Sequence, residues 1–217
     1  MTRVTIPSMN VRTRLVMMVA GWGTVGVGYS IGRIAPGAAH VLHEGALDRL
    51  VPFDASAIWL YLSFFLFVPV AYLCAPPERV KPLARAMQYS AVLAAIVFVA
   101  WPTTLVYPLV PHGASGAGAL RALSDFDSSR NCMPSLHGAL TLLCMLAIAQ
   151  RARPWRTALM FAWGIAVMWS VVAARRHLAV DLGAGLLLGA LCAGLVARLS
   201  AYGERAAQFN PSPETHP

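Results

Sequence analysis

The hydrophobic residues of this chain gather in six long segments, and short polar stretches separate one segment from the next. The segments span residues 15–32, 57–75, 88–110, 133–150, 157–175 and 178–199. A bilayer core about 30 Å thick is crossed by roughly 20 predominantly apolar residues in an α-helix. The pattern therefore predicts an all-α fold, an integral membrane bundle of six transmembrane helices.

Little of the chain remains for a soluble domain. We interpret residues 15–200 as one six-helix membrane domain and the polar residues 1–14 and 201–217 as tails. Arg12 and Arg14 precede the first apolar segment, as basic residues do in a secretory signal peptide. That segment has about 18 apolar residues and exceeds the roughly 7–15 of a signal-peptide core, so we expect a retained helix.

The basic residues are distributed unevenly between the two sides of this six-span arrangement. The chain has 17 basic residues and a formal net charge of +8, although only 12% of its residues are charged. Eleven of the 17 fall on one side, namely Arg3, Arg12, Arg14, Arg79, Lys81, Arg85, Arg151, Arg153, Arg156, Arg198 and Arg205. Because basic residues concentrate in cytoplasmic loops, both termini are predicted to be cytoplasmic, and segments 111–137 and 175–181 to face outward. Charge that follows the membrane sides in this way does not favour nucleic acid as a partner.

Ionisable residues stand at the margins of the apolar segments, where they are costly to keep and indicate function. His177 and Asp181 are four residues apart, so a helix places them on one face. The carboxylate can accept a hydrogen bond from one imidazole nitrogen and leave the other as a lone-pair nucleophile. Asp181 lies about one turn inside an otherwise uncharged segment, which favours this interpretation over a chance ion pair at the interface.

A second histidine stands near the start of the fourth segment, in the string Asn131-Cys132-Met133-Pro134-Ser135-Leu136-His137. Pro134 suits the first turn of a helix, and Ser135 and His137 would follow within that turn. A helix N-terminus presents free amide hydrogens and the positive end of the helix dipole to an anion. We therefore expect His137 to act as a general acid that protonates a leaving oxygen.

Three arginines stand beside these histidines. Arg175 and Arg176 precede His177, and Arg130 precedes the string that ends at His137. Guanidinium groups match phosphate oxygens in a bidentate manner and stabilise the charge of a transferring phosphoryl group. We predict that Arg130, Arg175 and Arg176 bind a substrate phosphate. Anchoring to lipid headgroups is the alternative for each of them.

Two outer segments connect the spans near these residues. In residues 34–56, the side chains of His40, His43 and Glu44 could ligate a metal, but interfacial polar residues are the plainer interpretation, and we predict no metal site. Residues 111–130 are rich in glycine and small polar side chains, which indicates a loop. This loop would either cover an outward-facing site or serve as a connector.

Small residues indicate where helices pack in lipid. Gly185 and Gly189 lie four residues apart in the last segment, and four glycines crowd the first segment, Gly21, Gly23, Gly26 and Gly28. Because small residues let helix backbones approach closely, we interpret both sets as packing faces.

The two histidine strings resemble the second and third motifs of the type 2 phosphatidic acid phosphatase superfamily, Pro-Ser-Gly-His and Ser-Arg-x5-His-x3-Asp. The resemblance implies a six-helix membrane core and a reaction that passes through a phosphohistidine, without a metal or another cofactor. It further implies that His177 is the nucleophile, Asp181 its partner, His137 the general acid and Ser135 a phosphate contact.

The sequence departs from the family's pattern at several positions. Val171 occupies the place of the third motif's arginine, and Leu136 replaces the glycine of the second motif. The first motif, Lys-x6-Arg-Pro, is absent, since the sole lysine, Lys81, lies on the predicted cytoplasmic side. The second string is similar to the branch that contains inositol phosphorylceramide synthase, whose members transfer a phosphoryl headgroup to an alcohol.

The residues and the resemblance together predict an integral membrane lipid phosphate phosphatase or phosphotransferase. Its substrate would be a lipid phosphoester or pyrophosphate at the outer face of a bacterial inner membrane, facing the periplasm, and either water or a lipid alcohol would accept the phosphoryl group. A lipid-binding or transport protein is the other class that fits six spans and outward arginines. The spacing of His177 and Asp181 favours the enzyme, because binding alone does not require an oriented imidazole. The expected partners are a lipid phosphate and membrane lipids, with the oligomeric state left open.

Overall fold

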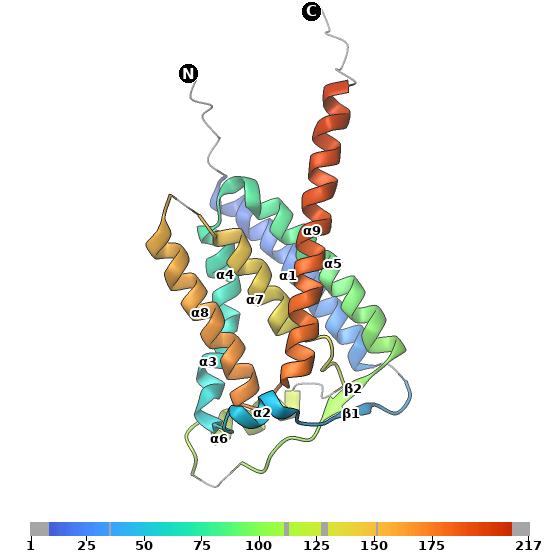
Figure 1. Cartoon of the computed structure of the whole chain (residues 1–217), viewed down its shortest axis with the longest axis vertical. Coiled ribbons are helices and arrows are strands. Elements are labelled where there is room, and N and C mark those ends of the chain that lie inside the picture. Colours follow the sequence, from blue (N-terminus) through green and yellow to red (C-terminus); the bar gives the residue numbers. More distant parts are fainter. Residues whose placement is uncertain (1–8, 35, 111–112, 127–129, 151, 210–217) are drawn as a thin grey trace, which may run out of the picture.

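The fold is built almost entirely from helices, which Figure 1 shows packed side by side. The computed structural model describes residues 9–34, 36–110, 113–126, 130–150 and 152–209. Within them the helices are α1 (Val11–Arg33), α2 (Ala46–Leu50), the 3₁₀ turn η1 (Ala55–Ala57), α3 (Ile58–Leu62), α4 (Phe64–Cys74), α5 (Pro77–Ala100), α6 (Ala117–Phe126), α7 (Leu136–Ile148), α8 (Pro154–Ala173) and α9 (Ala179–Phe209). The described residues also form two short strands, β1 (His40–Leu42) and β2 (Thr103–Leu105).

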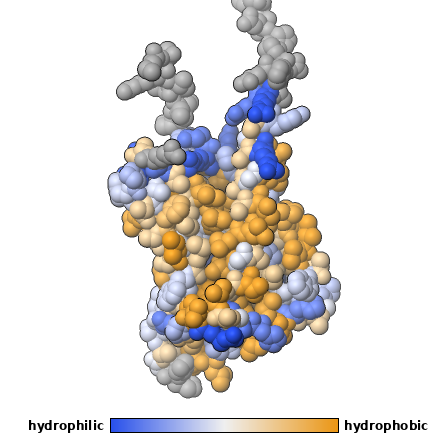
Figure 2. Space-filling view, in the orientation of Figure 1, coloured by the Kyte–Doolittle hydropathy of each residue, from blue (hydrophilic) through white to orange (hydrophobic). Residues whose placement is uncertain are grey.

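Among the described residues, five helical segments are long and apolar enough to cross a membrane. They are Val11–Arg33, Ala55–Cys74, Pro77–Ala100, Pro154–Ala173 and Ala179–Arg205. Figure 2 shows the resulting apolar band between two polar ends of the molecule. The chain is therefore a helical membrane protein, and helices of full spanning length overlap five of the six predicted apolar segments. The predicted bounds 88–110 were wrong for the third of them, because α5 begins at Pro77 and ends at Ala100.

The remaining predicted segment, residues 133–150, forms the shorter helix α7. Its 13 residues extend about 20 Å at the usual rise per residue, which is less than the thickness of a bilayer core. Residues Met133–Ser135 at the start of the segment belong to an irregular stretch that precedes the helix. Ten of the 13 residues of α7 are buried, so this helix forms the centre of the bundle, between α4, α5, α8 and α9.

The two ends of the bundle differ in what they carry. The helix α1 begins, and α9 ends, at the same end of the molecule, whereas α2, α6, the two strands and the connection from α8 to α9 gather at the opposite end (Figure 1). The segments that carry His137 and His177 therefore lie at one end of the bundle, away from the start of α1 and the end of α9. The side of the membrane that each end faces stays a prediction from the charge distribution.

Close backbone contacts hold α7 against α9. A Cβ atom added to Gly185 would overlap the carbonyl oxygen of Ser135, and one added to Gly189 would lie 2.8 Å from the carbonyl oxygen of Ala139. Gly138, on α7, meets Leu182 in the same way. The prediction that Gly185 and Gly189 form a packing face is confirmed.

The glycines of α1 divide into two groups. Gly21 and Gly28 lie against the backbone of α5, where added Cβ atoms would come within 2.9 Å of Ala84 and Ala91. Gly23 and Gly26 have no neighbouring atom within 4 Å of an added Cβ atom. The prediction that all four glycines pack against a helix is therefore wrong for Gly23 and Gly26, which face open space.

Arginine side chains tie the ends of helices together at the end of the bundle where α1 begins. Arg14 donates hydrogen bonds to the carbonyl oxygens of Tyr72 and Ala75, each 2.7 Å long, at the C-terminus of α4. Arg79 donates to the carbonyl oxygen of Leu146 at the C-terminus of α7. These carbonyls have no partner within their own helices, so the guanidinium groups satisfy them and complement the negative end of the helix dipole.

A small parallel sheet departs from the predicted all-α fold. The register pairs His40 with Thr103 and Leu42 with Leu105. Thr103 is fully buried and also binds the stretch before α7: its side chain accepts a hydrogen bond of 2.8 Å from the backbone N–H of Met133. Hydrophobic periodicity could not reveal this pairing, because it is made by backbone groups of two short connections.

The segment predicted to be a loop at residues 111–130 contains the helix α6. Leu120 is buried in an apolar cluster with Ile58, Tyr61 and Val171, and Leu123 is packed against the same cluster. The spacing of Leu120 and Leu123 fits one face of a helix, and their burial stabilises it despite the glycines nearby. The helix therefore covers the end of α3 and α8.

We expect Gly185→Ala to lower the melting temperature of the purified protein by roughly 2–10 °C, because the added methyl group would press on Ser135. Gly194→Ala is the matched control, since an added Cβ atom at Gly194, also in α9, meets nothing within 4 Å. Thermal unfolding in detergent compares the two variants. Equal melting temperatures would contradict the close contact between α7 and α9.

Candidate active site

The centre of the candidate site is a hydrogen-bonded pair at the start of α9. Nδ1 of His177 lies 3.0 Å from Oδ2 of Asp181, which is fully buried. The other carboxylate oxygen, Oδ1, accepts a hydrogen bond of 2.8 Å from the backbone N–H of Leu178. The two partners hold the carboxylate in one orientation. In the tautomer that donates Nδ1–H to this carboxylate, Nε2 of His177 carries the lone pair.

The connection between α8 and α9 determines where the His177 ring points. Arg175 has a φ of 51°, in the left-handed region that side chains rarely adopt. The backbone N–H groups of Arg176 and His177 then both donate to the carbonyl oxygen of Val171, at 3.0 Å each. This tight turn places the side chains of Arg175 and Arg176 in different surroundings, although they are adjacent in sequence.

The backbone of Asp181 joins α9 to the start of α7. The N–H of Ser135 donates to the carbonyl oxygen of Asp181, at 3.0 Å. Ser135 is the N-cap of α7, and its side chain accepts a hydrogen bond from Gly138, so Pro134 precedes the helix instead of standing in its first turn. The sequence-based position of the helix start was wrong by two residues, but His137 does lie in the first turn.

The two histidines predicted to act together are in direct contact. Nδ1 of His137 lies 3.2 Å from Nε2 of His177. Because Nε2 of His177 carries the lone pair, Nδ1–H of His137 is the donor in this hydrogen bond. His137, His177 and Asp181 therefore form one continuous chain of hydrogen bonds.

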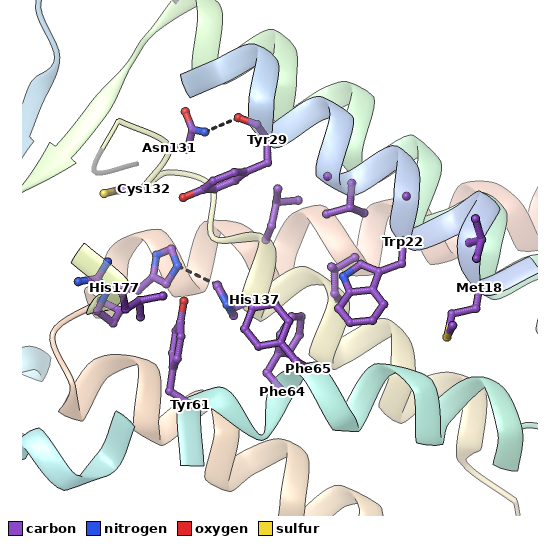
Figure 3. A pocket seen from close by; sticks show the side chains of 18 of the residues that line it. Met18, Trp22, Tyr29, Tyr61, Phe64, Phe65, Asn131, Cys132, His137 and His177 are labelled. Atoms are coloured by element: carbon purple, nitrogen blue, oxygen red, sulfur yellow. Dashed lines mark hydrogen bonds between the residues drawn. The ribbon is translucent and has the colours of Figure 1, made fainter. Parts of the chain in front are cut away.

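Aromatic side chains enclose the ring of His137. The ring centroids of Tyr61 and Phe64 lie 4.7 and 4.6 Å from that of His137. Both residues come from the kinked pair of helices α3 and α4, which Figure 3 shows facing the two histidines. Aromatic walls exclude water from a site and strengthen electrostatic interactions inside it.

Arg176 is the cation that accompanies the histidines. Its guanidinium carbon lies 4.2 Å from the centroid of the Tyr107 ring, and Nη1 donates to the hydroxyl of Ser124 at 3.0 Å. The residue is 4% exposed and lines the same cavity as His137 and His177. Tyr107 and Ser124 therefore position a buried positive charge beside the imidazoles.

Arg175 does not line that cavity, and it binds residues 36–54 between α1 and η1, which we call the outer connection after its predicted side. Nε donates to Glu44 at 2.7 Å, and Nη2 donates to the carbonyl oxygens of Asp48 and Val51. Asp48, which is buried, in turn accepts a hydrogen bond of 2.6 Å from the N–H of Ala179 at the start of α9. Arg175 thus fastens residues 44–51 to the turn before His177, and Asp48 fastens them to the first residue of α9.

Two further residues predicted to bind phosphate are also engaged in the framework. Arg130 donates to the carbonyl oxygen of Gly37 in the outer connection. Ser135 is fully buried beneath the start of α7, where its hydroxyl oxygen caps the helix. Of the four residues predicted to bind phosphate, all within the described ranges, Arg176 alone lines the cavity with the histidines.

The histidines stand at one end of a cavity of about 550 Å³. Beyond Arg176, His177 and His137, the wall becomes almost wholly apolar and continues along α1 and α4 to Trp22 and Met18 (Figure 3). A charged end joined to a long apolar end suits an amphipathic ligand, whose polar group would meet the imidazoles.

Two of the three residues weighed as metal ligands, His40 and Glu44, have other partners. The ring of His40 packs against Trp101, at 5.5 Å between centroids, and Glu44 binds Arg175. Within the part of the chain that the structure describes, no group of three or more His, Cys, Asp or Glu side chains is suited to hold a metal ion.

Several residues of the site carry no sequence signal of their role. Tyr61, Phe64 and Tyr107 occur in ordinary apolar stretches, and only the folded chain brings them to His137 and Arg176. Asp48 is the exception, because a carboxylate among apolar residues at a membrane margin is costly and indicates a buried partner.

Comparison with known families agrees with this geometry. A family model described as the PAP2 superfamily matches residues 40–195, which is most of the chain. The chain therefore belongs to this superfamily, the type 2 phosphatidic acid phosphatases that the two histidine motifs resemble. Membership suggests phosphatase or phosphotransferase activity on a lipid-type substrate. No curated protein matches the sequence.

We expect Arg175→Ala to lower the melting temperature by roughly 5–10 °C, because the backbone oxygens of Val51, Asp48 and Val172 would each lose a charged donor. Arg33→Ala is the control, since Arg33 is an exposed residue at the end of α1. If both variants unfold at the temperature of the wild type, Arg175 does not hold the outer connection.

Proposed function

We propose that this protein is an integral membrane enzyme that breaks a lipid phosphoester or pyrophosphate bond through a phosphohistidine on His177. The observation that carries the proposal is the chain of hydrogen bonds from Asp181 through His177 to His137, at the polar end of an apolar cavity. Superfamily membership supports the same class of chemistry.

In the first step, Nε2 of His177 attacks the phosphorus atom and forms an N–P bond. The P–O bond to the lipid breaks, and His137 transfers a proton to the departing oxygen. As His177 gains positive charge, the carboxylate of Asp181 stabilises the ring through the hydrogen bond at Nδ1. Asp181 thus acts as a positioning and charge-stabilising partner.

The contact between the two imidazoles implies that the substrate must separate them. Reacting atoms approach to about 3–3.5 Å before a bond forms, and the leaving oxygen lies on the far side of the phosphorus. A phosphoryl group therefore cannot fit between nitrogens that are 3.2 Å apart. Substrate binding replaces the hydrogen bond between His137 and His177, and the lone pair of His177 then faces phosphorus.

In the second step, His137 removes a proton from the acceptor, whose oxygen attacks the phosphohistidine and breaks the N–P bond. Water as acceptor releases a phosphate, whereas a lipid alcohol as acceptor gives a new phospholipid. The reaction resembles that of the inositol phosphorylceramide synthase branch in the second case. Hydrolysis is favoured because it requires a pocket for one lipid only.

Arg176 stabilises the charge on the phosphoryl oxygens. It is the cation that lines the cavity beside His177, and Tyr107 and Ser124 hold its guanidinium group in place before the substrate arrives. Preorganised charge of this kind lowers the barrier without reorganisation during the reaction. Arg130, Arg175 and Ser135, which were expected to share this role, support the outer connection and the start of α7 instead.

The site is proposed to face the outside of the cell, which in a bacterium is the periplasm. The excess of basic residues at the opposite end of the six-span arrangement supports this orientation. Six spans with both termini in the cytoplasm require α7 to count as a crossing element, although it is shorter than the others. The substrate would then be drawn from the outer leaflet of the inner membrane.

We expect His177→Ala to lower turnover of a lipid phosphate by about 10⁴-fold or more, and His137→Ala by about 10²–10⁴-fold. Release of phosphate by the purified variants provides the measurement, and His43→Ala, in the outer connection, is the control. The wild-type protein should also form an acid-labile phosphoenzyme that His177→Ala lacks. Full turnover in both histidine variants would refute the mechanism.

Product analysis with purified protein separates the possible activities. Free phosphate from a panel of lipid phosphates is expected if water is the acceptor, and a new phospholipid indicates transfer to a lipid alcohol. EDTA should leave the rate unchanged, because imidazoles supply the nucleophile and the acid. Lipid binding without any product would instead favour a binding or transport protein, and loss of activity with EDTA would point to a metal.

A further inference from the structure

The lining of the cavity on α1 consists of two neighbouring lines of residues. Met18, Trp22, Val25 and Tyr29 follow one another at intervals of four, three and four, so they form one ridge along the helix. Val19, Gly23 and Gly26 follow at intervals of four and three and form the adjacent line. The second line lacks side chains at two of its three positions.

The missing side chains leave a shallow channel on the surface of α1, which we call the α1 trough, lined by Val19, Gly23 and Gly26. Added Cβ atoms at Gly23 and Gly26 would meet nothing within 4 Å, in contrast to those at Gly21 and Gly28, which press on α5. Helix packing therefore does not account for these two glycines. Each glycine lowers the stability of the helix relative to alanine. We therefore interpret the space beside Gly23 and Gly26 as the reason for glycine at these positions.

The trough runs from the catalytic end of the cavity toward the middle of the membrane. Tyr29 and Met18 are eleven residues apart, which corresponds to about 16 Å along a helix and to about half the thickness of a bilayer core. Figure 3 shows Met18 and Trp22 at the end of the cavity away from His177. The depth of the cavity along α1 therefore matches one leaflet, and the trough, from Val19 to Gly26, covers about 10 Å of it.

The trough is open on the side that faces lipid and bounded on the other. Val19 is 66% exposed and Phe65, across the cavity on α4, is 48% exposed. Trp22 approaches Phe64 and Phe65, with ring centroids 6.5 and 6.1 Å apart, and so joins α1 to α4 beside the trough. The gap at Gly23 and Gly26 leaves room for a narrow apolar group along the surface of α1.

We propose that one hydrocarbon tail of the phosphorylated lipid lies in the α1 trough, and that Gly23 and Gly26 determine which tails the enzyme accepts. The inference rests on the proposed function, because the phosphate at His177 and Arg176 fixes the tail's starting point. A tail in the trough leaves the bilayer sideways past Val19 and exchanges lipid contacts for contacts with Trp22 and Phe65. A bulky or stiff tail would meet the backbone of α1.

Filling the trough provides the first test. Gly26→Leu is expected to raise KM for hexadecyl phosphate by about tenfold, which corresponds to the loss of burial of about two methylene groups. KM for hexyl phosphate, whose tail is shorter, should change less than about twofold. Gly26→Ala should give an intermediate value. Gly194→Leu is the matched control, because Gly194 also faces open space and lies on α9, outside the cavity. Equal changes for both substrates, or the same change in Gly194→Leu, would overturn the proposal.

A second test locates the tail without requiring turnover. Hexadecyl phosphate with a diazirine at the end of its tail is irradiated with the His177→Ala variant in lipid nanodiscs, and labelled peptides are identified by mass spectrometry. Labelling is expected between Met18 and Trp22 and should decrease in the variant that also carries Gly26→Leu. Label spread evenly over the outer surfaces of α8 and α9 would overturn the tail assignment. Failure of the proposed function would appear separately, as wild-type turnover equal to that of His177→Ala.

Discussion

A carboxylate buried inside a membrane protein is the constraint on which the rest of this structure depends. Asp181 is fully buried, and an ionised carboxylate in such surroundings is tolerated only when its oxygens are bound. The backbone of Leu178 binds one oxygen and His177 the other, while the carbonyl oxygen of the same residue accepts from Ser135. One residue thus orients the imidazole at the start of α9 and connects it to the start of α7. The two strings that resemble the family's motifs come together because Asp181 binds both of them.

That junction requires both a close approach of two helices and a rigid outer framework. Gly185 and Gly189 permit the close approach of α7 and α9, since side chains there would overlap the backbone of Ser135 and Ala139. The rigid framework has two parts. Arg175 and Asp48 bind the turn and the start of α9 to residues 44–51. Thr103, in β2, binds the stretch before α7. The two adjacent arginines near the site therefore have different roles. Arg176 is directed into the cavity, while Arg175 serves the framework.

The sequence allowed the local parts of the site to be predicted, and the limits of that prediction have physical causes. His177 and Asp181 are one helical turn apart, so their contact follows from spacing alone, and the apolar segments placed His137 at the same end of the bundle.

Adjacency in sequence gave no such guidance for Arg175 and Arg176, since a residue with positive φ turns the two side chains in different directions. The aromatic residues around His137 come from a different helix pair, and no local pattern marks them. Helix α6 was missed because the composition of residues 111–130, with several glycines and small polar side chains, concealed the buried Leu120 and the partly buried Leu123. The sequence could not separate the packed glycines of α1, Gly21 and Gly28, from the open ones, Gly23 and Gly26. The difference between them is whether α5 lies against the residue.

The short length of α7 shields His137, in its first turn, from changes in the thickness of the bilayer. A helix that spans the full hydrocarbon core must tilt or bend when membrane thickness changes, at a cost of a fraction of a kcal/mol for each ångström of mismatch. With ten of its 13 residues buried among other helices, α7 offers the lipid almost no surface on which such a force can act. Thickness changes are absorbed by the surrounding helices, and the imidazole at the head of α7 keeps its position relative to α9. The hydrogen bond between His137 and His177 is therefore expected to keep its geometry in membranes of differing lipid composition.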